Sequence, residues 1–180
     1  LTDTYIAQGF DAVIMDTVDS AAVTGPAQRA AENGVLFACA DTIPDEPDLM
    51  TVTVSSDNEG GGVACGELMK KYLPEGGQII MVTFMYSSRT MDGRYDGFRS
   101  AIEGSGIEIV EEVATDGSRE DAMAKITPIL SKYPDLKGIY CTQGDPAVGV
   151  LSAVEGAGLQ DKIKIVTFDV DDELADLIRN

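Results

Sequence analysis

The sequence contains no histidine and no tryptophan, and its cysteines are limited to Cys39, Cys65 and Cys141. Without histidine, Ser-His-Asp triads, H-E-x-x-H sites and mixed Cys/His zinc sites are excluded. The cysteine count is odd, no C-x-x-C occurs, and each cysteine lies inside an apolar segment. We therefore expect three buried structural thiols.

Positive charge is also scarce, with 13 Lys and Arg against 31 Asp and Glu and a formal net charge of -18. Nucleic acids and anionic membrane surfaces both require basic contacts, so this segment is expected to bind neither. The sequence has no run of 18 apolar residues, and membrane insertion is not expected. The acidic excess is typical of a highly soluble surface.

Enzyme motifs are missing as well. The glycine run that begins at Gly60 resembles a dinucleotide-binding loop, but Cys65 stands where the third glycine of G-x-G-x-x-G belongs. Neither a phosphate-binding G-x-x-x-x-G-K-[ST] nor a G-x-S-x-G elbow occurs. No cofactor and no metal site are expected. An enzyme with paired carboxylates, such as a glycosidase, is kept as a minor alternative because the sequence singles out no such pair.

What the sequence does contain is a regular alternation of apolar and amphipathic segments. Strands are expected at residues 12–15, 35–40, 51–54, 78–83, 107–113, 138–141 and 163–168. Helices are expected at 19–33, 57–72, 91–103, 118–132, 145–156 and 171–179, with Asp19 and Ser118 as caps. This order predicts an α/β fold of parallel sheets flanked by helices.

Ligands of open parallel sheets bind at the carboxyl ends of the strands, so the polar residues that follow the strands are candidates. They are Asp16, Asp41, the segment from Ser87 to Arg94, Asp116, Gln143 and Asp169. Each of the four aspartates could instead cap the helix that follows it. Arg94, early in a helix, is either a surface partner of nearby acids or a forked donor that reaches into a cleft. Carboxylates and a guanidinium together complement sugar hydroxyls, which both donate and accept hydrogen bonds.

Five stretches resemble one family when they are taken together. They are IAQGFDAVIMDTVDS at 6–20, VSSDNEGGG at 54–62, GRYDGF at 93–98, YPDLKGIY at 133–140 and VTFD at 166–169. In order and spacing the chain resembles the type I periplasmic sugar-binding proteins of ABC transporters, the ribose-binding group in particular. The effector core of lac-family repressors shares this fold.

The resemblance implies two α/β lobes that close on a ligand. It implies ligand contacts at Asp41, Ser88, Arg94, Gln143 and Asp169. Two departures from the family's pattern argue against ribose itself. Gln143 stands where asparagine is usual, and Thr42 stands where ribose binders carry arginine.

The resemblance also implies how the chain is divided. Residues 1–56 match a partial first lobe with a hinge strand, and residues 57–180 match a nearly complete second lobe, so we expect a fragment truncated at both ends. The implied function is a non-enzymatic solute-binding protein that is periplasmic or extracellular, with or without a lipid anchor. Its partners would be a small sugar and a membrane permease. The alternative is the ligand-sensing core of a lac-family regulator.

Overall fold

The computed structural model describes residues 1–179, which form two compact units. Unit 1 consists of Leu1–Asn58 and Tyr86–Asp92, and unit 2 of Glu59–Met85 and the chain from Gly93 onward. The segment Tyr86–Asp92 therefore packs with residues that precede it by about 40 positions or more. Each unit is described separately below.

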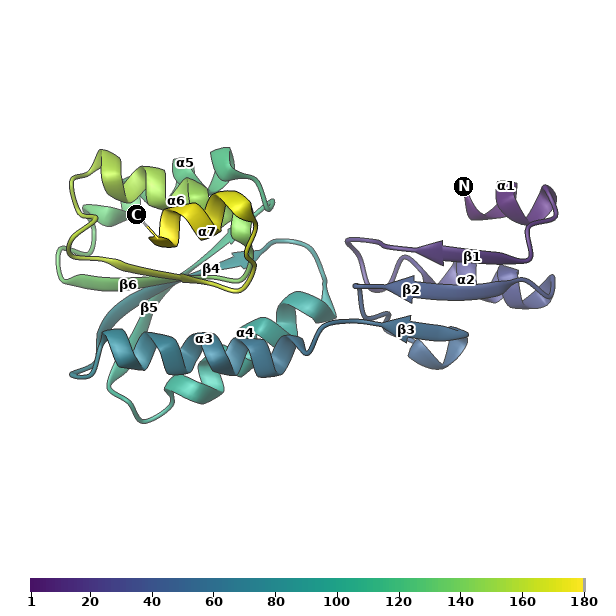
Figure 1. Ribbon diagram of the computed structural model, residues 1–180, viewed down its shortest axis with the longest axis horizontal. Coiled ribbons are helices and arrows are strands. Elements are labelled where there is room, and N and C mark those ends of the chain that lie inside the picture. Colours follow the sequence, from purple (N-terminus) through teal and green to yellow (C-terminus); the bar gives the residue numbers. More distant parts are fainter. Residues whose placement is uncertain (180) are drawn as a thin grey trace. The chain divides into compact units, whose positions relative to one another are not determined.

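Unit 1 is a small parallel sheet with helices packed against one face (Figure 1). Its strands β1 (Ala12–Met15), β2 (Leu36–Ala40) and β3 (Val52–Val54) pair in that order. The helices are α1 (Thr2–Ala7) and α2 (Thr24–Glu32), and a 3-10 turn covers Pro47–Leu49. Val13, Phe37 and Cys39 point to the helix side and are buried with Val23, Ala27 and Ala30.

The opposite face of the unit 1 sheet is apolar but exposed. Successive side chains of a strand point to opposite faces, so the neighbours of Val13 and Phe37 face away from α2. On that side Ile14 is 76% exposed, Val54 66% and Leu36 56%. Parallel sheets are normally covered on both faces, and unit 1 is covered on one.

Unit 2 is a doubly wound parallel sheet whose strands run in the order β5-β4-β6-β7. The strands are β4 (Gly77–Phe84), β5 (Ile107–Thr115), β6 (Leu136–Cys141) and β7 (Lys164–Thr167). The helices α3 (Asn58–Tyr72) and α4 (Arg89–Ile102) cover one face, α5 (Arg119–Leu130) and α6 (Gly144–Gly156) cover the other, and α7 (Asp172–Arg179) follows (Figure 1). Both faces are lined by fully buried side chains, such as Ile139 toward α5 and α6, and Met81 toward α3 and α4.

The predicted α/β fold with parallel sheets flanked by helices is confirmed, but two helix starts were misplaced. The helix expected from residue 19 begins at Thr24, because Asp19 caps a turn through the Ala21 N–H (2.9 Å). Ser20 is fully buried, and its hydroxyl accepts a hydrogen bond from the Arg89 N–H at 3.0 Å. The helix expected from residue 91 begins at Arg89. Ser118 caps α5 as predicted, by accepting from the Asp121 N–H.

The glycine run lies inside α3 and allows a close approach to α4. A Cβ on Gly62 would lie 2.3 Å from the Arg94 carbonyl oxygen. From the other helix, a Cβ on Gly97 would lie 2.1 Å from the Glu59 carbonyl oxygen. No larger residue fits at either position without moving a backbone, so these glycines serve packing. The three cysteines are buried and free, as expected.

Candidate functional site

Arg94 is a buried cation near the amino end of α4. Its side chain is 6% exposed, and one guanidinium nitrogen lies 2.9 Å from the Thr142 carbonyl oxygen and 3.3 Å from Asp169 Oδ2. A buried charge is costly unless it is paired, and here both partners follow strands of the unit 2 sheet. The partner carboxylate is 75 positions distant, so the view of Arg94 as a surface residue paired only with nearby acids is wrong.

Asp169 follows β7 and is 44% exposed, unlike its partner. Its Oδ2 accepts hydrogen bonds from Arg94 and, at 3.2 Å, from the Gly144 N–H. Both contacts use the same oxygen, which leaves Oδ1 without a partner among residues 1–179. The arrangement fixes the carboxylate and still leaves one acceptor for a ligand hydroxyl.

Phe168 contacts the arginine of the Arg94–Asp169 pair, although the sequence does not predict it as a functional residue. The Arg94 guanidinium carbon lies 3.9 Å from the centre of the Phe168 ring. The Tyr140 hydroxyl donates to the Arg94 carbonyl oxygen at 3.2 Å. The Tyr140 ring stacks on the Phe98 ring, with 3.9 Å between the ring centres. Burial raises the pKa of the Tyr140 phenol, which keeps it protonated as a donor.

Gln143 is the residue before α6, and the fold brings it beside the same region. Its carbonyl oxygen accepts from the Thr167 hydroxyl at 3.0 Å, and its neighbour Gly144 contacts Asp169. Its side-chain Oε1 is shielded from solvent and has no hydrogen-bond partner in the described part of the chain. That oxygen lies near Gly117, where a Cβ would be 3.6 Å from it and 3.2 Å from the Phe84 ring.

The residues Arg94, Phe168, Asp169 and Gln143 will be called the Arg94 cluster. All four lie in unit 2, where Gln143 and Asp169 follow neighbouring strands. Three of the five predicted ligand contacts are therefore brought together at the carboxyl ends of β6 and β7, where an open parallel sheet binds ligands.

The remaining two, Asp41 and Ser88, lie in unit 1. Asp41 is exposed and has a positive φ of 67°, which is uncommon for a residue with a side chain. Its carbonyl oxygen accepts from the Thr90 hydroxyl at 3.4 Å and the Ser55 hydroxyl at 2.7 Å. Ser88 is 3% exposed, and hydrogen bonds of the Thr90 hydroxyl with Asp41 and Ile43 hold Tyr86–Asp92 against the loop after β2.

Two other acids predicted as candidates each accept a hydrogen bond from a residue of their own unit. Asp16 Oδ1 accepts from the buried Thr42 hydroxyl at 3.3 Å. Asp116 Oδ1 accepts from the Ser118 hydroxyl at 2.6 Å and the Ser118 N–H at 2.9 Å, and these hydrogen bonds lower the pKa of the Asp116 carboxyl. Asp116 therefore stabilises the turn before α5 but does not cap the helix itself, because Ser118 is its N-cap.

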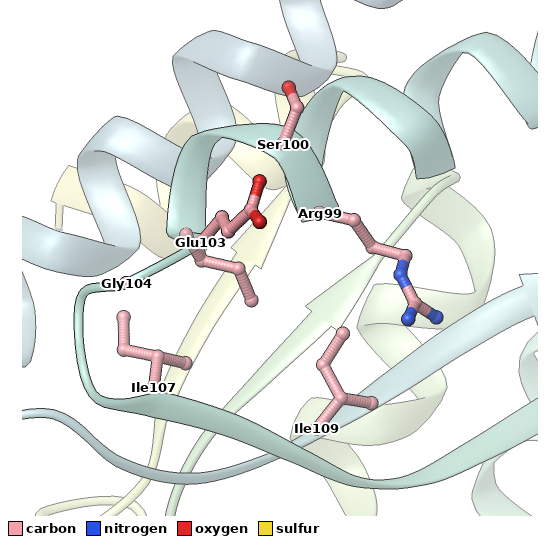
Figure 2. Close-up of a pocket in the computed structure, with 7 residues that line it drawn as sticks. Arg99, Ser100, Glu103, Gly104, Ile107 and Ile109 are labelled. Atoms are coloured by element: carbon pink, nitrogen blue, oxygen red, sulfur yellow. The ribbon is translucent and has the colours of Figure 1, made fainter.

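A surface pocket lies elsewhere in unit 2, between the end of α4 and β5 (Figure 2). It is lined by Arg99, Ser100, Ile102, Glu103, Gly104, Ile107 and Ile109. The Arg99 guanidinium is already paired with Glu112 at 2.8 Å and with the Tyr95 hydroxyl. The pocket's one cation is thus neutralised, and an anionic ligand is not favoured there.

Within residues 1–179, no group of three or more Asp, Glu, Cys or His side chains is arranged to hold a metal ion. None of the helices in the same range is long and apolar enough to cross a bilayer.

Comparison with known proteins gives a match to one family over the whole chain. The family described as periplasmic binding protein domain matches residues 1–180. The D-ribose/D-allose-binding protein of Pseudomonas aeruginosa is 26% identical over 174 residues, which are 94% of this chain and 54% of that protein. The D-apiose import binding protein of Paraburkholderia graminis is 26% identical over 99% of this chain and 57% of its own length. The chain thus spans little more than half the length of these relatives.

Solved structures give the same result. The myo-inositol binding protein of Caulobacter, solved with myo-inositol, is 28% identical with a TM-score of 0.92, covering 99% of this chain and 62% of that one. A solute-binding protein of an ABC transporter from Agrobacterium vitis, solved with D-fucose, has the same TM-score at 22% identity, covering 99% of this chain and 62% of its own. The second likeness is evidence for the fold alone.

Proposed function

We propose that this chain, which belongs to the periplasmic binding protein domain family, binds a monosaccharide or a related polyol for an ABC importer. The observation that carries the proposal is the Arg94–Asp169 pair, in which a buried guanidinium holds a half-exposed carboxylate at the carboxyl ends of parallel strands. A fixed carboxylate accepts from a hydroxyl, and a neighbouring guanidinium donates to one.

The relatives support this ligand class. Their names give ribose or allose, apiose and myo-inositol as ligands, all of them small and polyhydroxylated. In addition, the Arg94 cluster offers one basic side chain against a chain of net charge -18, which disfavours phosphorylated ligands. A neutral sugar or cyclitol fits this balance best.

The test is calorimetric titration of the full-length protein with D-ribose, D-allose, D-apiose, D-fucose, D-arabinose and myo-inositol. Binding of at least one is expected, and Asp169→Asn should weaken it by about 10- to 100-fold, since a hydrogen bond to a charged group contributes about 1.5–3 kcal/mol. Arg94→Gln should weaken it at least as much. Binding of an unrelated metabolite class with none of these ligands bound would contradict the proposal.

A matched control lies in α7. Arg179 and Asp176 form a pair at the same distance of 3.3 Å, but their side chains are 74% and 72% exposed. Arg179→Gln and Asp176→Asn remove the same groups from an exposed site and should leave the affinity unchanged. The control separates loss of the Arg94 cluster from a general change of charge.

Asp41 and Ser88 stay predictions as ligand contacts, and Asp41 is tested independently of the Arg94 cluster. Asp41→Asn replaces the exposed carboxylate by an amide of similar size and should weaken binding of the same ligand. The αL backbone at Asp41 favours asparagine as the replacement, because asparagine tolerates a positive φ better than alanine does. An unchanged affinity in this variant would remove Asp41 from the site.

Transport follows from the same proposal. A permease is the proposed partner, and the relatives named as import proteins favour it over the lac-family regulator. The relatives are named as binding proteins, so we propose that the bound sugar is released unchanged, which chromatography of a long incubation tests. A periplasmic location agrees with the family, whereas a lipid anchor stays a prediction for cell fractionation.

A further inference from the structure

The geometry points to Phe168 and Gly61 as positioning residues for the Arg94 guanidinium. This inference rests on the proposed function and deepens it, because it concerns how the ligand-binding arginine is held. Neither residue is among the ligand contacts predicted from the sequence. Both act through Arg94, whose guanidinium carbon lies 3.9 Å from the Phe168 ring centre.

The Phe168 ring also presses against α3, at a point where no side chain is present. A Cβ on Gly61 would lie 2.1 Å from the ring's Cε2 and 2.8 Å from its Cζ. Real Cβ atoms do not approach so closely, so any residue larger than glycine would displace the ring. The ring is partly buried and belongs to the core between the sheet and the helices α3 and α4.

The ring and the hydrogen bonds both hold the Arg94 guanidinium. A guanidinium that lies over a ring face is attracted to that face, and the attraction is stronger where water is excluded. Arg94 is 5% exposed, so the stack is desolvated. The Thr142 carbonyl oxygen and Asp169 Oδ2 hold one nitrogen of the same guanidinium, at 2.9 and 3.3 Å.

A guanidinium held in this way is oriented before a ligand arrives. Binding then costs less conformational entropy, because the long arginine side chain has already lost its freedom. If the ring were only a core residue, its loss would lower stability without changing how Arg94 binds. The two roles are separated by following Arg94 itself.

The first measurement needs no ligand. In NMR spectra of the chain, the Arg94 side-chain N–H should be shifted by the ring current of Phe168 and protected from solvent exchange. Phe168→Leu keeps an apolar side chain but removes the ring, and Gly61→Ala displaces it, so both should abolish the shift and speed exchange. Phe168→Tyr keeps the ring and should restore both features. Arg99 is the internal control, because it lies over Tyr95 at 5.3 Å and its signal should not move.

The second measurement uses the best-bound sugar of the titration panel. Phe168→Leu should weaken binding about tenfold, by analogy with the loss seen when a residue that orients a metal ligand is removed. In an Arg94→Gln background the same substitution should have no further effect, because the two residues act as one. Phe168→Tyr should restore most of the affinity.

The outcomes separate this inference from the proposed function. An Arg94 signal that is unchanged in Phe168→Leu and Gly61→Ala overturns the inference, as does an equal loss of affinity in both arginine backgrounds. If no sugar binds the unmodified chain while the Arg94 signal responds as expected, the proposed ligand is wrong and the positioning role stands.

Discussion

Units 1 and 2 each contain a parallel sheet with helices packed against it, but their sheets are covered to different extents. The unit 2 sheet is covered on both faces, by α3 and α4 on one and by α5 and α6 on the other. The unit 1 sheet is covered on one face, and its other face exposes Ile14, Leu36, Val52 and Val54. Apolar strand residues on a covered face therefore contribute far more to stability than those on the uncovered face of unit 1.

The two units also differ in charge density, although their net charges are equal. Unit 1 carries 11 acidic and 2 basic side chains, and unit 2 carries 20 and 11, so each has a formal net charge of -9. Unit 1 holds this charge on 65 residues, unit 2 on 115. With less buried core and denser negative charge, unit 1 is expected to be the less stable of the two.

The largest expected effect comes from the same substitution made in both sheets. Ile139→Ala removes a fully buried side chain between the unit 2 sheet and its helices, and should lower the free energy of unfolding by about 2–5 kcal/mol. Ile14→Ala, at a side chain that is 76% exposed, should change it by less than about 0.5 kcal/mol. Urea denaturation followed by hydrogen exchange assigns each change to its unit.

Each isoleucine variant is the control for the other, because the atoms deleted are identical. A loss at Ile14 as large as the loss at Ile139 would mean that the exposed face is buried in solution, and the difference in coverage between the two units would disappear.

The fold could be predicted from the sequence where it depends on local patterns, and not where it depends on tertiary contacts. Strand and helix patterns depend on local periodicity, so all seven strands expected within residues 1–179 are present, with ends that differ by three residues or fewer. The misplaced start of α2 has a tertiary cause. Ser20 would suit a cap, but its hydroxyl binds the Arg89 N–H, a partner 69 positions away that no local pattern reveals.

For the candidate site, the sequence predicts acids and Gln143 at strand ends but not the residues that hold them. The burial of Arg94 depends on Asp169 and Thr142, which come from two later parts of the chain. Phe168 reads as an ordinary apolar residue before an acid, and Gly61 as one of several glycines. Their roles follow from contacts of Phe168, just after β7, with α3 and α4 that only the folded chain defines.

The next prediction compares the buried thiols of the two units. Burial raises the pKa of both Cys39 and Cys141, with Asp16 adding to the effect at Cys39, so little thiolate forms while the units are closed. Labelling by a disulfide reagent then requires local opening, after which the thiol titrates near its ordinary pKa of about 8.5. Cys39 in unit 1 should react first, about tenfold faster for each ~1.4 kcal/mol by which unit 1 opens more easily.

Mass spectrometry of the labelled peptides at two pH values checks both parts of this prediction. For each thiol the rate should rise between pH 7 and about 8.5, because the opened thiol ionises in that range. Equal rates at Cys39 and Cys141 would indicate that the two units open together. Unit 1 could then not be ranked as less stable than unit 2.

The smallest expected effect is that of salt, and it isolates the charge difference from the difference in core. Near 1 M NaCl the Debye length is about 3 Å, so repulsion among exposed acids is screened. Salt should therefore raise the unfolding midpoint of unit 1 more than that of unit 2. Glu46→Gln with Asp48→Asn removes two exposed charges from unit 1 and should reduce its salt response, while Glu108→Gln with Asp135→Asn is the matched pair in unit 2. Hydrogen exchange at low and high salt measures each unit separately. If unit 1 stays equally unstable at high salt, charge density is not the cause, and the uncovered sheet face accounts for the difference.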